Sequence, residues 1–297
     1  MEYIVNTLRC RNLELDKLRS YSSVFSRSVF TRLVKFGDYS TINLVCRTYD
    51  KDMLSPNATY GDYLNWMYLS MVANYRTEYV FKNALVNKIL SLNKSRNITV
   101  FNEFRVGESI ADVATFNGKS CVYEIKTALD SPKRLAGQSE DYFKFFQECY
   151  LVIPRNQLDA YLSCIDVRMG VITVNEYRGN TTVSRFRKAT TLTANIDVDV
   201  LMKVLWIQEY ESIVKKYFGK LPDVGYFDMY DACREQMRLI PGDKLSKMAI
   251  EVIKKRKKND VLFDNEMKNL TQMCLALNLN ARQYEQLCVN LNETIKL

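Results

Sequence analysis

The amino-acid sequence predicts a mixed α/β protein in which helical regions flank a short β-rich centre. The 297 residues include only 10 Gly and 5 Pro, fewer turn-forming residues than an all-β fold would use. Apolar residues recur with helical spacing up to about residue 93 and again from about residue 197, whereas β-branched and aromatic residues form short runs in between. Because 47% of the residues are apolar, the chain can bury a large core, and we expect most of it to fold.

The N-terminal region, residues 1–74, has the aromatic-rich periodicity of packed helices. Thr59 is a good N-cap residue and predicts a helix that begins at Tyr60. The pattern indicates a break near Asn74 and a second helix that continues toward Asn93.

The centre of the chain begins with three short runs that are typical of strands. They cover residues 98–105, 110–116 and 120–126. Asn117-Gly118 separates the second run from the third, and this dipeptide is the strongest short-range signal of a β-hairpin. We therefore expect these two strands to pair antiparallel.

A helix and further strands are expected after the hairpin. Ser131-Pro132 combines an N-cap residue with proline at the first helical position, which predicts a helix toward Gln147. Residues 150–153 are wholly apolar, as in a buried strand. The pattern then predicts a short helix at 158–164 and strands at 171–174 and 182–186.

Positive charge is concentrated near the C-terminus. Residues 243–258 carry seven Lys and Arg against two Asp and Glu, within a net charge of +8 for the chain. Apolar residues recur every three or four positions after Pro241-Gly242, which predicts an amphipathic basic helix. Such a helix can follow a phosphate backbone because each neutralised phosphate releases counterions. The predicted nucleic-acid-binding residues are Lys254, Lys255, Arg256, Lys257 and Lys258. A solvated helix end, with cations at the negative pole of the helix dipole, explains the same segment equally well.

The chain contains no histidine, and this absence excludes several catalytic classes. Ser-His-Asp and Cys-His nucleophile pairs, His-bearing zinc fingers and HExxH metallopeptidase helices all need imidazole. Proton abstraction near pH 7 therefore has to use a carboxylate, Lys, Tyr, Cys or a metal-bound water.

Cysteine spacing and hydropathy point to the cell interior. None of the eight cysteines forms a CxxC pair, which excludes zinc ribbons and thioredoxin-type motifs. The first nine residues lack the apolar core of a secretory signal. Charge-free stretches such as residues 63–75 are shorter than the roughly 20 residues that span a bilayer. We expect a cytoplasmic protein with reduced thiols and no membrane partner.

Asp112, Glu124 and Lys126 are the residues from which we expect chemistry. Glu124 and Lys126 are two positions apart in a strand, so their side chains lie on the same face of the sheet. The predicted hairpin can bring Asp112, on the preceding strand, close to both. Two carboxylates at one place offer the oxygen ligands that a hard divalent cation such as Mg²⁺ takes. An exposed Glu-x-Lys ion pair worth about 0–1 kcal/mol is the alternative explanation.

Together with its surroundings this pattern resembles the PD-(D/E)xK nuclease superfamily. Asp112 is followed after eleven residues by Glu124-Ile125-Lys126. The Gln138-x-x-x-Tyr142 pair on the next predicted helix is similar to the motif of the RecB-type branch. The segments Ser109-Ile110-Ala111-Asp112-Val113 and Tyr123-Glu124-Ile125-Lys126 are similar to those of a little-characterised bacterial branch described only as nuclease-like. Ala111 stands where the family name has proline, a position that does not itself bind metal.

The resemblance implies a restriction-endonuclease-like αβββαβ core with a mixed sheet at residues 75–190. A helical region, residues 1–74, precedes this core, and a second helical region with the basic helix, residues 191–297, follows it. The resemblance covers the central region and leaves the two flanks unexplained.

The resemblance also implies a role for each site residue. Asp112, Glu124 and the Ile125 backbone carbonyl would bind Mg²⁺ or Mn²⁺, and Glu78 would reach the metal through water. Lys126 would orient the attacking water and stabilise the charge that builds on the phosphate. The remaining two side chains, Gln138 and Tyr142, would hold the lysine or the phosphate backbone. A helix face that merely packs on the sheet is the alternative for this pair.

Three functional hypotheses remain open. The first is a metal-dependent DNA endonuclease or exonuclease that serves defence against foreign DNA or belongs to a mobile element. The second is a nuclease-like fold that binds nucleic acid without cutting it. The third is a protein-interaction module whose N-terminal helices form a homo-oligomer or bind a protein partner.

Overall fold

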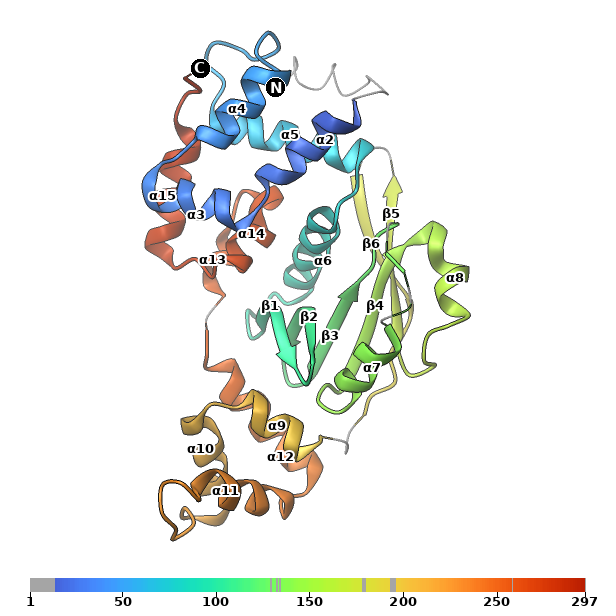
Figure 1. Cartoon of the computed structure of the whole chain (residues 1–297), viewed down its shortest axis with the longest axis vertical. Helices are drawn as coiled ribbons and strands as arrows, with labels where there is room; N and C mark the ends of the chain where they lie inside the picture. Colours follow the sequence, from blue (N-terminus) through green and yellow to red (C-terminus); the bar gives the residue numbers. More distant parts are fainter. Residues whose placement is uncertain are drawn as a thin grey trace. The chain divides into compact units, whose positions relative to one another are not determined.

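The computed structural model in Figure 1 describes residues 14–296, except residues 129, 132, 134, 178–179, 193–195 and 258. These residues form two compact units. The first, the helical unit, contains the described residues up to 94, together with 174–183 and 260 onward. The second, the sheet unit, contains residues 95–173 and 184–259. Both units are discontinuous in sequence, so they group the chain differently from the three sequential regions expected above, which stay a prediction.

A six-stranded mixed sheet confirms the predicted α/β class. Its strands are β1 (Thr99–Val106), β2 (Ser109–Phe116), β3 (Ser120–Ile125), β4 (Glu148–Pro154), β5 (Gly170–Tyr177) and β6 (Asn180–Arg187). They lie in the order β1-β2-β3-β4-β5-β6, with β1–β2 and β2–β3 antiparallel and β3–β4 parallel. Helical regions flank the sheet in sequence on both sides, as expected.

The β2–β3 hairpin forms where Asn117-Gly118 predicts it. Phe116 pairs with Ser120, and Gly118 adopts φ +65°, a left-handed conformation that glycine accepts without strain. The pairing continues as far as Val113 opposite Tyr123. This register carries the next residues of the two strands, Asp112 and Glu124, into the same region of the sheet.

Helix α7 (Leu135–Phe143) connects β3 to the parallel strand β4. With α6 (Glu78–Leu92) the observed order is α6-β1-β2-β3-α7-β4, which confirms the predicted αβββαβ sequence of elements. The helix begins at Leu135, later than the Ser131-Pro132 signal indicates, and Pro132 lies outside the described residues. Every residue of β4 is buried, as its apolar run predicts. After β4 come η2 (Arg155–Gln157) and α8 (Leu158–Leu162).

Four further helices share the core of the sheet unit. They are α9 (Val198–Val204), α10 (Ile207–Phe218), α11 (Met229–Arg238) and α12 (Gly242–Lys254). One hydrophobic cluster contains Phe104 of β1, Phe146 from the segment between α7 and β4, and Leu201 and Ile253 from these helices. The predicted basic helix is confirmed as α12, but it ends at Lys254, so the remaining basic residues follow the helix.

The edge strand β1 has part of its free backbone covered by a side chain. Asn259 accepts a hydrogen bond from the Val100 N–H (2.7 Å) and donates one to the Val100 carbonyl (3.3 Å). The Thr99 hydroxyl donates to the Lys254 carbonyl at 3.4 Å. An amide side chain thus replaces a neighbouring strand at this point of the edge.

The helical unit contains the N-terminal helices and the last helices of the chain. Its elements are α2 (Leu15–Val24), α3 (Arg27–Phe36), α4 (Ser40–Tyr49), α5 (Tyr60–Asn74), α6, α13 (Asp260–Asp264), η3 (Lys268–Leu270), α14 (Thr271–Ala276) and α15 (Ala281–Asn292). Thr59 caps α5, and its capping box with Asp62 confirms the predicted helix start. Asn290 of α15 donates to the Leu33 carbonyl at 2.7 Å, which fixes α15 against α3.

A buried polar cluster holds α2, α4 and α5 together. Lys17 lies 2.5 Å from Asp50, which is 1% exposed. Tyr21 and Tyr63 both donate to Asp50 at 2.7 Å, and Trp66 donates to the Tyr21 hydroxyl. Burial, followed by the nearby Asp50 carboxylate, raises the pKa of both tyrosines, so they remain donors.

Within the part of the chain that the structure describes, no helix is long and apolar enough to cross a membrane.

Candidate functional site

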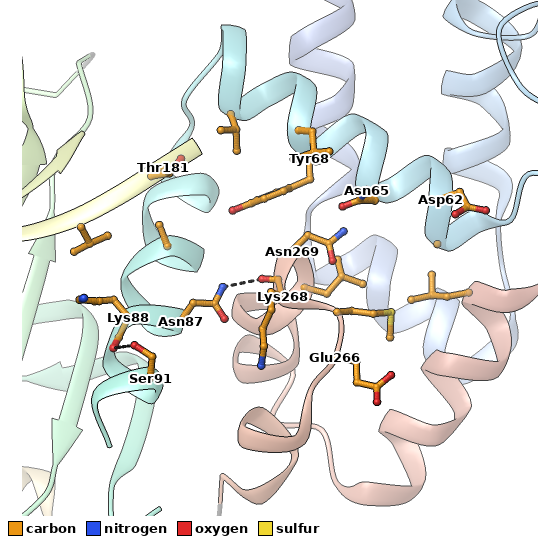
Figure 2. A pocket seen from close by; sticks show the side chains of 18 of the residues that line it. Asp62, Asn65, Tyr68, Asn87, Lys88, Ser91, Thr181, Glu266, Lys268 and Asn269 are labelled. Atoms are coloured by element: carbon orange, nitrogen blue, oxygen red, sulfur yellow. Dashed lines mark hydrogen bonds between the residues drawn. The ribbon is translucent and has the colours of Figure 1, made fainter. Parts of the chain in front are cut away.

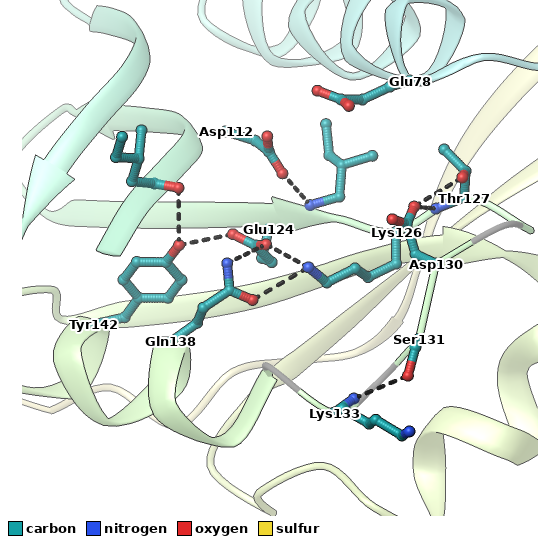
Figure 3. A network of polar contacts seen from close by, with 12 residues as sticks. Glu78, Asp112, Glu124, Lys126, Thr127, Asp130, Ser131, Lys133, Gln138 and Tyr142 are labelled. Atoms are coloured by element: carbon teal, nitrogen blue, oxygen red, sulfur yellow. Dashed lines mark hydrogen bonds and ion pairs between the residues drawn. The ribbon is translucent and has the colours of Figure 1, made fainter. Parts of the chain in front are cut away.

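Five of the residues singled out in the sequence meet where the β2–β3 pairing ends and on the adjacent helix α7 (Figure 3). Glu124 lies at their centre and is 3% exposed. Its Oε1 accepts hydrogen bonds from the Lys126 ammonium (2.7 Å) and from the Gln138 amide (2.8 Å). Its Oε2 accepts from the Tyr142 hydroxyl at 2.7 Å. Three donors therefore converge on a single carboxylate.

Lys126 is held by two acceptors. Besides Glu124, the Gln138 side-chain carbonyl accepts from its ammonium at 3.1 Å. Lys126 is 9% exposed, so this ion pair is buried and is not the exposed surface pair considered as the alternative. Its backbone N–H donates to the Val152 carbonyl of β4, which fixes the lysine main chain to the sheet.

Helix α7 presents Gln138 and Tyr142 from one face because they are one helical turn apart. Tyr142 is fully buried, and its hydroxyl lies within 3.3 Å of the Ile110 carbonyl as well as 2.7 Å from Glu124. Burial first, and then the negative charge of Glu124, raises the pKa of Tyr142, so its hydroxyl stays protonated and donates. The pair bonds directly to Glu124 and Lys126, and does more than pack on the sheet.

Asp112 continues the contact between β2 and β3 through its side chain, beyond the last backbone pair of the two strands. Its Oδ2 accepts a hydrogen bond from the Ile125 backbone N–H at 2.7 Å. The side chain of one strand thus binds the backbone between Glu124 and Lys126 on the next strand. This contact holds the Asp112 carboxylate beside the Ile125 peptide group.

The turn after Lys126 is closed by a further carboxylate. Asp130 accepts hydrogen bonds at 2.7 Å from both the backbone N–H and the hydroxyl of Thr127. The Tyr161 hydroxyl lies 3.3 Å from the Asp130 carbonyl. These contacts restrain the main chain directly after the lysine.

The donor set suits a hard cation in type, although it is small. Asp112, Glu124 and the Ile125 carbonyl supply oxygen ligands only, and Mg²⁺ commonly uses one or two protein carboxylates and keeps several waters. Among the described residues, no group of three or more His, Cys, Asp or Glu side chains is arranged to hold a metal ion. Any metal here would therefore depend on water for most of its ligands.

Glu78 lies at the start of α6 in the helical unit. Its carboxylate is 2.5 Å from the ammonium of Lys82, one turn later on the same helix. The expected water-mediated contact of Glu78 with a metal stays a prediction.

The basic run after α12 is partly occupied by contacts inside the sheet unit. Arg256 forms two hydrogen bonds with the Glu209 carboxylate (2.5 and 2.7 Å) and one with the Val204 carbonyl (2.8 Å). Its guanidinium carbon lies 4.6 Å from the centre of the Trp206 ring, and its side chain is only 10% exposed. Arg256 thus joins the end of α12 to the junction between α9 and α10.

Its neighbours differ in accessibility. Lys254 donates to the Asn97 side chain at 2.6 Å, whereas Lys255 is exposed. The Lys257 ammonium lies 4.8 Å from the centre of the Phe101 ring, and burial lowers its pKa to about 8. Lys258 lies outside the described residues. The surface available for a phosphate backbone is narrower than the run of five cations indicates, and DNA binding there stays a prediction.

The helical unit contains a separate cavity of about 930 Å³ that the sequence did not indicate (Figure 2). Its walls include Tyr68 from α5, Asn87 from α6, and Lys268 near the C-terminal helices. Asn83 and Asn87 both donate to the Lys268 carbonyl, at 2.8 and 2.7 Å, which fixes one wall. Nothing in the local sequence pairs these segments, because the contacts span more than 180 positions.

The fold and the site together define a mixed α/β protein whose sheet carries a buried carboxylate–lysine network. Residues 71–279, well over half of the chain, match the family model described as Bacteriophage P4 protein cII, and the chain belongs to this family. No curated protein matches the sequence.

One solved structure is similar over part of the chain. It is a protein of unknown function from Silicibacter pomeroyi, with 10% sequence identity and a TM-score of 0.31. The similarity covers 50% of this chain and 94% of that protein.

Proposed function

We propose that this protein is a metal-dependent phosphodiesterase that cuts DNA. The observation that carries the proposal is the buried network in which Glu124 binds Lys126, Gln138 and Tyr142 while Asp112 binds the intervening peptide. Burying a lysine and a glutamate carries a large desolvation penalty. Apolar side chains at the same positions would give the protein equal or greater stability, so stability alone does not account for the pair. The network therefore favours a chemical role. The resemblance to PD-(D/E)xK nucleases supplies that role.

In this proposal Lys126 acts on the scissile phosphate. Its ammonium is held by the Glu124 and Gln138 side chains, and can donate its third proton to a phosphate oxygen or to the attacking water. Tyr142 holds Glu124 from the opposite oxygen, so the carboxylate cannot turn away. Preorganised charge of this kind needs no rearrangement as the negative charge builds on the phosphate.

Asp112, Glu124 and the Ile125 carbonyl would hold Mg²⁺ or Mn²⁺. When bound, the cation would supply Lewis-acid chemistry and lower the pKa of a bound water, so that hydroxide is available near neutral pH in a chain that has no histidine to act as a base. The family description names a bacteriophage protein, which supports an association with a mobile element.

The test is cleavage of supercoiled plasmid and of linear DNA by the purified full chain, with Mg²⁺, Mn²⁺ or EDTA. We expect cleavage only with metal, and a loss of about a hundredfold or more in Lys126→Met and Asp112→Asn. Lys144→Met is the matched control, because Lys144 is an exposed lysine of the same unit. Cleavage that persists in both site variants would refute the proposal.

One observation favours a second candidate, a nuclease-like protein that binds nucleic acid without cutting it. Both Glu124 oxygens already accept hydrogen bonds within the protein. This candidate predicts salt-dependent DNA binding that EDTA does not change, with no cleavage under any metal condition. Filter binding at several salt concentrations, run beside the cleavage assay, separates the two.

A further inference from the structure

The last turn of α7 is tied to the β1–β2 turn by a carboxylate outside the predicted motif. Asp141 Oδ2 accepts a hydrogen bond from the Ser109 hydroxyl at 2.7 Å and one from the Glu108 backbone N–H at 3.2 Å. Ser109 is the first residue of β2, the strand that carries Asp112. Asp141 therefore joins the helix to the start of that strand.

A glycine in the β1–β2 turn leaves room for the Asp141 carboxylate. Gly107 adopts φ +58°, and a Cβ at this position would lie 2.8 Å from the Asp141 carboxyl carbon. Any other residue would be strained at this φ, and its Cβ would displace the Asp141 carboxyl group from its present position. The Asp141 carboxylate therefore packs directly against the backbone of the β1–β2 turn.

The neighbouring residues make a second link of the same kind. Tyr142 follows Asp141, and its hydroxyl lies 3.3 Å from the carbonyl of Ile110, which follows Ser109. Two consecutive residues of α7 thus contact two consecutive residues of β2. Only the second link, through Tyr142, also belongs to the network around Glu124.

These contacts anchor α7, which carries Gln138 and Tyr142, to the strand that carries Asp112. The side chains of the site come from β2, from β3 and the residue that follows it, Lys126, and from α7. The antiparallel ladder fixes β2 to β3, but α7 is a nine-residue helix, which has little stability of its own. The position of Gln138 and Tyr142 over Glu124 depends on how α7 is anchored to the sheet.

We propose that Asp141 is a positioning residue, whose bonds to Ser109 and Glu108 set Gln138 and Tyr142 onto Glu124. The placement itself follows from the geometry. Its effect on catalysis rests on the proposed nuclease function. Because a displacement of about 1 Å can cost about a hundredfold in rate, loosening α7 slows the reaction although no residue in contact with DNA is removed.

The first test does not depend on activity. Replace Tyr142 by 3-fluorotyrosine in the full chain and record its ¹⁹F resonance, which reports the hydrogen bond to Glu124. Asp141→Ala should shift or broaden this resonance, and Asp141→Asn, which keeps an acceptor oxygen for Ser109, should restore it. Glu140→Ala makes a similar truncation at the exposed preceding residue and should leave the resonance unchanged. A resonance that is the same in Asp141→Ala and the parent overturns the proposal.

The second test measures cleavage well below the unfolding temperature of each variant. Asp141→Ala should lower kcat by about tenfold to a hundredfold with KM for DNA unchanged, and Glu140→Ala should match the parent. A shifted resonance with unchanged kcat would reject the catalytic effect and leave the nuclease assignment standing. A parent protein that never cuts DNA would refute the proposed function, while the ¹⁹F measurement still decides whether Asp141 positions α7.

Discussion

Replacing Glu124 by Gln should destabilise the protein strongly, although the two side chains have nearly the same shape. Glu124 is 3% exposed and faces the Lys126 ammonium, whose side chain is only 11% exposed. Removing the carboxylate charge leaves this ammonium buried without a counter-charge, which typically costs about 3–5 kcal/mol. The hydrogen bonds from Lys126 and Tyr142 contribute in the same direction, because each loses its charged acceptor. Bonds to a charged group are worth about 1.5–3 kcal/mol, against about 0.5–1.5 kcal/mol for neutral ones.

The assay is urea unfolding in EDTA, followed by circular dichroism. With a dependence of about 2 kcal/mol per molar urea, a loss of about 4 kcal/mol lowers the midpoint of the unfolding transition by about 2 M. Lys126→Met should cost a comparable amount. The double variant Glu124→Gln/Lys126→Met should be more stable than the sum of the two losses indicates, because it leaves no buried charge. If the Glu124→Gln midpoint stays within about 0.3 M of the parent, or if the two losses add, the pair is not buried and coupled as described.

Three other substitutions test the surrounding structure. Asp50→Ala should lower the free energy of unfolding by about 3–5 kcal/mol, since it leaves buried Lys17 unpaired; a shift in melting temperature of under about 3 °C would contradict this. Burial raises the pKa of Glu148, but its hydrogen bonds, first from Lys119, outweigh this and lower it overall. The stabilisation by Glu148 is therefore complete above the unfolded pKa, about 4.3, and is lost as the pH falls through the folded pKa. Glu148→Gln should flatten the dependence of the free energy of unfolding on pH below about pH 5. A dependence on pH that runs parallel to that of the parent would refute this. Asn259→Ala uncovers the N–H and carbonyl that its side chain satisfies on β1, and should cost about 1–3 kcal/mol in urea unfolding; an unchanged midpoint would show that water replaces the amide.

Local signals in the sequence predicted local structure well. Asn117-Gly118 correctly predicted the position of the β2–β3 turn, because the conformational preference of this dipeptide acts within a few residues. Thr59 placed the start of α5 for the same reason, through a hydrogen bond three residues away. Gln138 and Tyr142 were placed on one helical face by their spacing, and they do meet the carboxylate and the lysine.

Long-range partners were not predictable in this way. Arg256 belongs to an obvious basic run, yet its partner Glu209 is 47 positions away and nothing near either residue marks the pairing. Asp141 was likewise not singled out, because its role appears only when the β1–β2 turn lies beside α7. The two ends of the helical unit are joined by contacts over more than 180 positions, which periodicity does not encode.

This pairing of distant segments bears on the order in which the protein folds. During synthesis from the N-terminus, residues 95–259 emerge before α15, which supports α3 through Asn290. Helices α2 to α6 must therefore wait for most of the chain before their unit is complete. Closing so long a loop costs entropy that grows only slowly with its length, and a sheet unit that has already folded shortens the flexible part. If the sheet unit folds first, it therefore lowers the entropy cost of bringing together the helices that precede and follow it in the sequence.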